Sequence, residues 1–291
     1  MSNTMTVMVT GATGKQGGSV IKALLRSGYR VVALTRDPAS KSAMILHNDG
    51  VRIAIGDMSH EDSLAGVMTG VDAVFAMSTP FQSGHEGEVA QGVNVTKAAK
   101  TAGVRHLVFS SVASANKNTG IPHFDTKFKI EQYIAASGIP YTIIGPAAFM
   151  ENFIQPQAIA ALKEGKLRRA LPASRPVQLV AVEDIGAFAV FAIEHPQFLL
   201  NKRIDIAGDE LTGEQTAAIL TRSIGRMITY EEFSPEVLKS RSPDLAKMME
   251  WQAKNDYTAD IGRLRLDFPE IGWHRLEEWA RGIDWKALLA S

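Results

Sequence analysis

The sequence predicts an α/β protein, with a doubly wound parallel sheet and a smaller α/β lobe in the C-terminal half. Two observations support this fold class. Short apolar runs alternate six times with helical patterns before residue 152, as expected for parallel strands joined by right-handed helical crossovers. The first apolar run also passes through a glycine-rich turn into a helical pattern, which is the local order of a dinucleotide-binding unit.

The predicted elements follow from these runs and from the residues that interrupt them. Gly28 and Gly103 each end a helical pattern, and Gly138 with Pro140 ends a third. The predicted strands of the sheet are 5–9, 30–35, 51–55, 71–77, 105–111 and 141–144. The predicted helices between them include 19–27, 40–48, 84–102 and 124–137.

Beyond residue 152 this alternation changes, which predicts a domain boundary. We expect residues 1–152 to form the dinucleotide-binding domain and residues 153–291 to form the smaller lobe over the cofactor and substrate cleft, with segments within 177–207 able to extend the sheet. The lobe is expected to contain helix 154–164, strand 177–180, helix 182–195, strand 203–207, a helix opening at 211–215 and strand 229–233. Thr212 and Gln215 have the spacing of a capping box.

The composition excludes several classes of function. The chain has 31 Lys and Arg against 31 Asp and Glu, so it lacks the basic surface that direct nucleic-acid binding requires. Without cysteine it has no disulfide or thiolate metal site, and its His and acidic clusters lack a third convergent ligand, so no metal is expected. No signal peptide or membrane span is recognisable, and we therefore expect a cytoplasmic protein.

The turn at residues 10–18 contains the candidate phosphate site. Gly11 can adopt a backbone angle that a side chain would forbid, and Gly14 lets a diphosphate approach the main chain. Gly17 lets the following helix lie close to the strand. The first N–H groups of that helix and its dipole favour a bound anion.

The end of the second predicted strand is where a Rossmann unit reads the adenosine ribose. Arg36 occupies the first position after this strand, and Lys41 follows a few residues later. Because an arginine there accommodates a 2′-phosphate, the sequence predicts NADP(H) rather than NAD(H) as the cofactor. In the alternative, Arg36 is a solvated loop cation and Asp37 binds the ribose.

Two further strand ends carry candidate residues. Asp57 follows the third strand and is a candidate for the adenine amino group, with a second possibility that it caps the helical stretch at 61–64. Ser78, Thr79 and Pro80 follow the fourth strand, at the edge where open α/β sheets bind ligands.

Three segments resemble the NmrA-like family, a group of atypical short-chain dehydrogenase/reductases. They are residues 11–20, 123–127 and 149–153, and their order and spacing agree along almost the whole chain, including 207–212. The resemblance implies a Rossmann fold with NADP bound along the edge of the sheet. One departure is Ala90, where a redox-sensing member of the family has a lysine that contacts the cofactor.

The resemblance also implies a role for each candidate by its position. Arg36 would bind the 2′-phosphate, Asp57 and Met58 would flank the adenine, and Lys127 would contact the nicotinamide ribose. The remaining contacts would come from Gly11, Ala12, Thr13, Gly14, Lys15 and Gln16 at the diphosphate, from Ser78, Thr79 and Pro80 on the way to the nicotinamide, and from Phe149, Met150, Glu151 and Asn152 over its end.

The sequence specifies the catalytic residues less strongly than it specifies the cofactor. A typical short-chain dehydrogenase uses Tyr-x-x-x-Lys, in which the tyrosine transfers the proton. Here Lys127 is present, but His123 stands at the tyrosine position, with Ser110 and Ser111 as candidates for the serine. His123 is the candidate acid because histidine titrates near neutral pH, and its alternative is a residue that packs or caps at a helix start. The alternative for Lys127 is a surface lysine.

Three functions remain open. We favour a cofactor-responsive redox sensor or regulator with weak or no dehydrogenase activity. The second hypothesis is an NADPH-dependent reductase of quinones or other conjugated molecules, and the third is a scaffold with a vestigial cofactor site. The partner besides NADP(H) is then either a protein or a small flat apolar substrate, and a homodimer is also compatible with the sequence. The residues that would form a substrate pocket, or alternatively belong to the core, are Phe81, Phe149, Met150 and Phe153.

Overall fold

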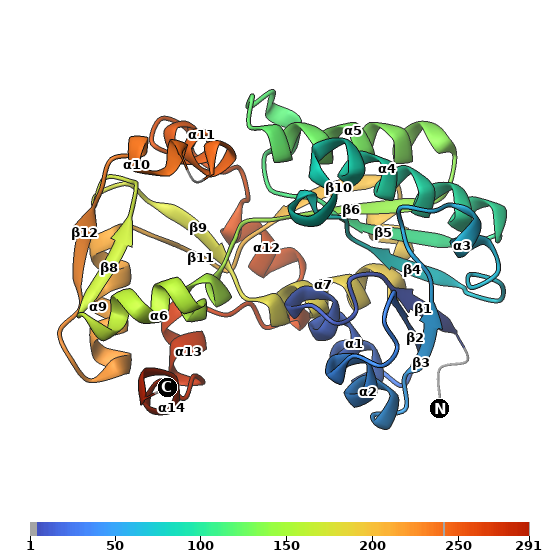
Figure 1. The fold of residues 1–291 in the computed structure, drawn as a ribbon, viewed down its shortest axis with the longest axis horizontal. Helices are drawn as coiled ribbons and strands as arrows, with labels where there is room; N and C mark the ends of the chain where they lie inside the picture. The colour runs from blue at the N-terminus through green and yellow to red at the C-terminus, as the bar shows by residue number, and fades with distance from the viewer. Residues whose placement is uncertain (1–4, 241, 291) are drawn as a thin grey trace. The chain divides into compact units, whose positions relative to one another are not determined.

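A seven-stranded sheet forms the centre of the first of two compact units (Figure 1). The structure is a computed structural model that describes residues 5–240 and 242–290, with the side chains of residues 81 and 82 outside the description. The first unit comprises Met1–Asn118, Pro122–Gly145 and Ile185–Ile204. The second comprises Thr119–Ile121, Pro146–Asp184 and Asp205–Ser291.

The sheet has the strand order β10-β6-β5-β4-β1-β2-β3. Its strands are β1 (Thr6–Val9), β2 (Arg30–Thr35), β3 (Arg52–Ile55), β4 (Ala73–Ala76), β5 (His106–Ser110), β6 (Tyr141–Pro146) and β10 (Lys202–Ile206). Strands β1 to β6 pair in parallel, with Val7 opposite both Val31 of β2 and Ala73 of β4. The predicted α/β fold class is therefore confirmed. Because the strand order reverses on either side of β1, the carboxyl ends of β1 and β4 border the crevice where such sheets bind ligands.

Helices lie on both faces of this sheet. They are α1 (Lys15–Arg26), α2 (Lys41–Asn48), α3 (Asp62–Ala65), α4 (Pro80–Thr101), α5 (Pro122–Ser137), α7 (Val182–Glu194) and α8 (Pro196–Leu199), with the 3₁₀ helix η1 (Ala115–Lys117). Figure 1 shows α4 and α5 along one face and α1 along the other. Buried residues of α4 and α5, such as Val95 and Ile130, pack with Phe109 of β5 in one apolar core.

Two predicted helices begin earlier than expected. Helix α1 starts at Lys15 rather than residue 19, so the second half of the glycine turn is already helical. Helix α4 starts at Pro80 rather than residue 84, and Gly84, with φ 70°, interrupts it with a non-helical residue. Only glycine adopts this backbone angle readily, which explains how two helical segments join there.

The second unit is built from short strands and helices. Its elements are β7 (Ala148–Phe149), η2 (Met150–Ile154), α6 (Pro156–Lys163), β8 (Lys166–Arg169), β9 (Val177–Val180), β11 (Asp209–Leu211), α9 (Gly213–Ile224), β12 (Thr229–Glu232), α10 (Glu236–Lys239), α11 (Pro243–Gln252), α12 (Ile261–Asp267), η3 (Pro269–Ile271), α13 (Leu276–Arg281) and α14 (Trp285–Ala290). Strand β9 lies between β11 and β7, and β12 pairs in parallel with β8. The capping box of Thr212 and Gln215 at the start of α9 is confirmed.

The second unit has its own apolar core, which includes Trp279 and Trp285. The sequence did not predict strands β7, β8 and β11. Strand β8 was not predicted because three of its four residues are basic, so it lacks the alternation of apolar and polar residues that indicates a strand. The sequence set its boundary after residue 152, whereas the compact units divide near residue 145 and residues 185–204 return to the first unit. None of the helices in the described residues is long and apolar enough to cross a membrane.

A buried histidine lies in the middle of the sheet. His106 of β5 is 5% exposed, and its Nε2 is 2.9 Å from the Thr142 hydroxyl. That hydroxyl donates its proton to the Leu199 carbonyl, so His106 Nε2 must be the donor. Its Nδ1 is buried and has no hydrogen-bond partner among the residues that the structure describes. Burial lowers the pKa of His106 to about 4.

We therefore expect the protein to lose stability in mild acid through His106. Between pH 6.5 and about 4 the unfolded chain binds a proton that the folded chain does not, so the free energy of unfolding falls with the pH in this window. The full effect is about 3 kcal/mol, from 1.36 kcal/mol per pKa unit. Urea unfolding at a series of pH values should show a shallower pH dependence for His106→Gln, and an unchanged dependence would contradict the assignment.

Candidate functional site

The glycine turn after β1 is shaped by two steric constraints. Gly11 has φ 59°, and a Cβ there would lie 2.7 Å from Met77 Sδ. A Cβ on Gly17 would overlap the backbone carbonyl of Gly11. Both glycines therefore have the roles that the sequence predicted: Gly11 provides the backbone angle, and Gly17 lets α1 pack directly on the turn.

The N-terminus of α1 fits an anion. Its N-cap is Gly14, so no side chain caps the first N–H groups, and no acidic residue lies in the first turn. Thr13, Gly14 and Lys15 are exposed, whereas Gln16 is buried and donates a hydrogen bond to Ser110 Oγ. The first N–H groups of α1 are thus donors of the kind that an anion such as a diphosphate accepts from. A Cβ at position 14 would lie 3.3 Å from the Gly11 carbonyl oxygen.

Arg36 and Asp57 occupy the ends of neighbouring strands β2 and β3. The Ser59 backbone N–H donates to Asp57 Oδ1 at 2.9 Å, and this bond is the main reason that the pKa of Asp57 lies below its ordinary value. The charge of Arg36 lowers that pKa further, so the two side chains lie within electrostatic reach. Asp57 does not cap α3, whose N-cap is Glu61, and that alternative is wrong. Asp37 closes a local turn by accepting from Ala39 N.

Helix α4 holds the loop that contains Met58. Asn94 Nδ2 donates to the Met58 carbonyl at 2.9 Å, and Gln91 Nε2 lies 3.4 Å from Ser59 Oγ. The sequence reasoning missed Gln91 and Asn94, since neither belongs to a recognisable motif. Their positions three residues apart on α4 put them on one helix face, and this spacing is the only signal that could have found them.

Lys127 is buried at the carboxyl end of β4, which excludes the surface-lysine alternative. The residue is 9% exposed, and its Nζ donates to the Ser78 carbonyl at 2.5 Å and lies 3.1 Å from Glu88 Oε1. Glu88 is fully buried and also accepts from the Thr126 hydroxyl at 2.5 Å. Burial lowers the pKa of Lys127, and the neighbouring Glu88 carboxylate raises it again.

Glu88 belongs to one of the loose His and acidic clusters of the sequence, with His85 and Glu86, and in the structure it pairs with Lys127. Among the described residues, no group of three or more His, Cys, Asp or Glu could hold a metal ion. Glu88 lies one turn before Gly92, where a Cβ would clash with Ile130 of α5. Gly92 thus lets α4 and α5 approach closely, and Glu88 faces α5 for the same reason. The sequence signal that could have found this contact is the spacing of Glu88 and Gly92, a charged and a small residue four positions apart on one buried face of the helix.

His123 is the second residue of α5. Its ring packs edge-on against Phe124, with the centroids 4.8 Å apart, which matches the packing alternative. Its role as an acid stays a prediction. The two candidate serines form hydrogen bonds with other residues: Ser110 accepts from Gln16, and Ser111 donates to Glu131. Thr79 precedes α4 and Pro80 begins it, and the side chain of Phe81 lies outside the described residues.

The segment Phe149–Asn152 lies in the second unit. Met150 is fully buried in the core of that unit. Glu151 accepts hydrogen bonds from Trp279 Nε1 at 3.0 Å and from Val182 N at 3.1 Å. These two side chains therefore have structural contacts of their own, and a role of the segment at the nicotinamide stays a prediction.

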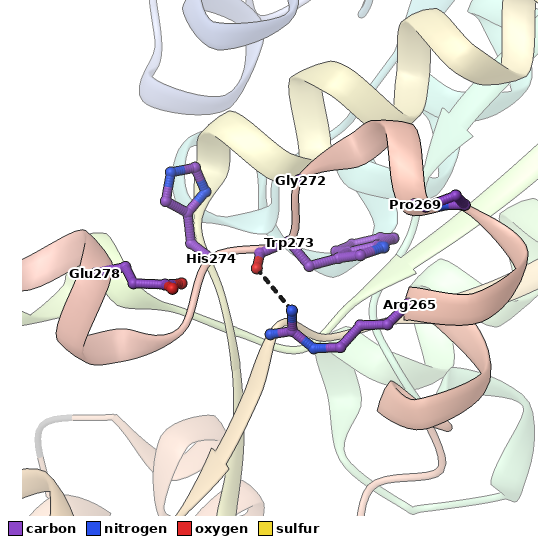
Figure 2. A pocket seen from close by; sticks show the side chains of 6 residues that line it. All are labelled: Arg265, Pro269, Gly272, Trp273, His274 and Glu278. Carbon is purple, nitrogen blue, oxygen red and sulfur yellow. Dashed lines mark hydrogen bonds between the residues drawn. The ribbon is translucent and has the colours of Figure 1, made fainter.

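A pocket of about 480 Å³ lies within the second unit, lined by Arg265, Pro269, Gly272, Trp273, His274 and Glu278 (Figure 2). His274 Nδ1 lies 2.5 Å from the fully buried Asp184, whose hydrogen bond raises the pKa of His274. Arg265 donates to the carbonyls of Trp273, at 3.0 Å, and of Gly208, at 2.8 Å. These bonds brace the segment before α13, and no predicted site residue lines this pocket.

Comparison with known proteins identifies the family. The model of the NmrA-like family matches residues 3–280. The chain belongs to the NmrA-like family. Its similarity to an NAD(P)H azoreductase of Xenophilus azovorans is 30% identity over 234 residues, which covers 80% of this chain and 79% of that protein. The resemblance on which the sequence analysis relied is therefore confirmed.

Two solved structures of similar fold contain a bound nicotinamide cofactor. An NADPH-dependent quinone oxidoreductase of Escherichia coli, solved with NADPH, is 28% identical with a TM-score of 0.77, covering 94% of this chain and 98% of that one. The negative transcriptional regulator NmrA, solved with NADP, is 21% identical with a TM-score of 0.78, covering 97% and 99%. The second likeness shows the shared fold alone.

The packing of the glycine turn gives a matched pair of variants. Gly17→Ala should lower the free energy of unfolding by about 2 kcal/mol, because its Cβ would overlap a backbone carbonyl that cannot swing away. In Gly18→Ala the nearest atom, Ala12 O, is 3.8 Å away, and alanine favours the helix by about 0.5–1 kcal/mol. Denaturant unfolding measures both, and equal effects would exclude a special close approach at Gly17.

Proposed function

We propose that this chain binds NADP(H) along the carboxyl edge of its seven-stranded sheet and reduces conjugated, electron-poor molecules such as quinones. The observation that carries the proposal is the uncapped start of α1 behind a turn in which glycines leave no room for side chains. This arrangement suits a diphosphate. Arg36 adds a cation at the strand end where a 2′-phosphate is read.

The residues of the edge would bind and orient the cofactor, which supplies a hydride when it is bound. Arg36 holds the 2′-phosphate, and the loop of Asp57 and Met58 receives the adenine. Hydrogen bonds from Ser59 and Asn94 fix this loop, so little order must be gained on binding. Ser78, Thr79 and Pro80 border the path toward Lys127.

Lys127 serves as a cation near the nicotinamide ribose in this proposal. Its ammonium group is held by Ser78 and Glu88, so its position is set before the cofactor arrives. The Glu88 carboxylate opposes the desolvation that would otherwise remove the proton from Lys127. Glu88 therefore acts as a positioning residue that maintains the charge.

The class of electron acceptor that we propose follows from the absence of the tyrosine that usually donates a proton. At position 123 a histidine replaces the usual proton donor, so an acceptor that needs strong acid assistance is unsuited. A quinone takes the hydride into a delocalised anion and then a proton from water, which balances as NADPH + H⁺ + quinone giving NADP⁺ + hydroquinone. The azoreductase and the quinone oxidoreductase among the relatives support a reductase of this kind.

A redox sensor with weak or no turnover is the second candidate. It is favoured by the packing of His123 on Phe124 at the position of the missing tyrosine. In that case binding of NADPH or NADP⁺ would change the association of the chain with a protein partner.

Calorimetric titration with NADPH, NADP⁺ and NADH, followed by NADPH absorbance traces with a panel of quinones and an azo compound, tests the proposal. NADPH binding with rapid oxidation by one acceptor supports the reductase. Binding without oxidation by any acceptor excludes it in favour of the sensor. Absence of NADPH binding excludes both.

Arg36→Asp tests the cofactor preference. It should weaken NADPH binding at least about tenfold more than NADH binding, because it replaces the cation facing the 2′-phosphate with a repelling charge. Arg52→Asp is the matched control, since Arg52 is an exposed arginine at the first residue of β3, on the opposite edge of the sheet. Calorimetry that gave equal losses for NADPH and NADH would reject the role of Arg36.

Glu88→Gln tests the buried ion pair. Without the Glu88 carboxylate, only the charge of Glu131 still opposes the effect of burial, so the pKa of Lys127 falls further below its ordinary value. The alkaline limb of the pH profile for NADPH affinity or kcat/KM should move to lower pH, while glutamine still accepts from Thr126. A profile identical to that of the parent protein would show that Glu88 does not control the charge of Lys127.

A further inference from the structure

Strand β8 carries two adjacent arginines that point to opposite faces of the strand. The guanidinium of Arg168 forms ion pairs with Glu164 at 2.6 Å and with Glu231 at 2.7 Å. That of Arg169 lies over the ring of Phe153, 4.9 Å from its centroid. Within residues 5–240 and 242–290, no carboxylate pairs with the Arg169 guanidinium and no group accepts a hydrogen bond from it.

The surroundings of Arg169 are aromatic. Phe153 is 2% exposed and belongs to the apolar core, while Tyr230 and Tyr257 lie within electrostatic reach of the guanidinium. Burial lowers the pKa of Arg169, yet the residue is only half-buried, so part of it remains accessible to solvent. A cation in such a place has lost part of its hydration, and one contact with an aromatic ring offsets only part of that loss.

A second donor lies near this cation. Tyr257 Oη accepts from Gln252 Nε2 at 2.5 Å, and no described residue accepts its own proton. Burial raises the pKa of Tyr257 to about 12, so the phenol keeps this proton at neutral pH. Tyr230, in contrast, already donates to the Leu171 carbonyl at 2.6 Å. Among the described residues, one cation and one hydroxyl donor thus have no acceptor, beside the buried ring of Phe153 and the half-buried rings of Tyr230 and Tyr257.

We infer that Arg169 and Tyr257 form an anion-recognition site in the second unit for a flat aromatic ligand bearing an acidic group such as a sulfonate or carboxylate. The planar guanidinium matches two oxygens of such a group, and the Tyr257 hydroxyl matches a further one. The half-buried rings of Tyr257 and Trp251, whose centroids are 6.1 Å apart, offer contact for the aromatic part. This inference rests on the proposed function, because it takes the ligand of this site to be the electron acceptor that the protein reduces.

Calorimetric titration of the whole chain with naphthalene-2-sulfonate and with naphthalene-2-sulfonamide, its neutral analogue, tests the site. The sulfonate should bind about tenfold more tightly, as expected for a charge-assisted hydrogen bond. Arg169→Gln should abolish this preference and leave sulfonamide binding unchanged. Arg168→Gln is the matched control on the other face of β8 and should keep the preference.

Tyr257→Phe provides a second variant that removes only the hydroxyl, and it should weaken sulfonate binding several-fold. Equal binding of the two probes by the parent protein would overturn the inference, as would an equal loss in Arg168→Gln and Arg169→Gln. The binding readout needs no turnover. A protein that prefers the sulfonate but never oxidises NADPH would refute the proposed reductase and leave the anion site intact.

Discussion

The contact between helix α1 and the turn after β1 is the constraint on which the candidate site depends. Gly17 lies so close to the Gly11 carbonyl that the helix cannot approach in this way with any other residue. This packing sets the direction in which the first N–H groups of α1 point. It also places Gln16 where it donates to Ser110 of β5, while Thr10 donates to the Met77 carbonyl beyond β4. The close approach of Gly17 to Gly11 thus aligns the carboxyl ends of β1, β4 and β5.

A second constraint is electrostatic. A lysine ammonium group as buried as Lys127 is costly unless an anion and hydrogen-bond acceptors compensate it. Glu88 and the Ser78 carbonyl provide this compensation, and they join α4, α5 and the end of β4 in one network. The network can keep a positive charge at a defined position, which is what a cofactor ribose or a reacting carbonyl requires.

The two units differ in whether their charged side chains are paired with groups of opposite charge. In the first unit the buried charges are paired, and the exposed Arg36 lies at the edge of the sheet. Within the described part of the second unit, Arg168 pairs with carboxylates and Arg169 does not, although they are neighbours in one strand. The pocket lined by Arg265 and His274 is instead held by internal hydrogen bonds. An uncompensated cation beside aromatic rings is therefore the feature of the second unit that is best explained by a ligand.

The sequence alone determined the elements whose signals are local. Strands 30–35 and 177–180 were predicted to the residue, and the capping box of Thr212 and the backbone angle of Gly11 follow from residue type and spacing. The tertiary structure decided what depends on distant residues. Glu88 meets Lys127, Asn94 holds Met58, and β8 exists because β12 pairs with it. Periodicity records which face of an element is apolar, whereas the partner of a buried charge depends on how helices pack, and no local pattern encodes that choice.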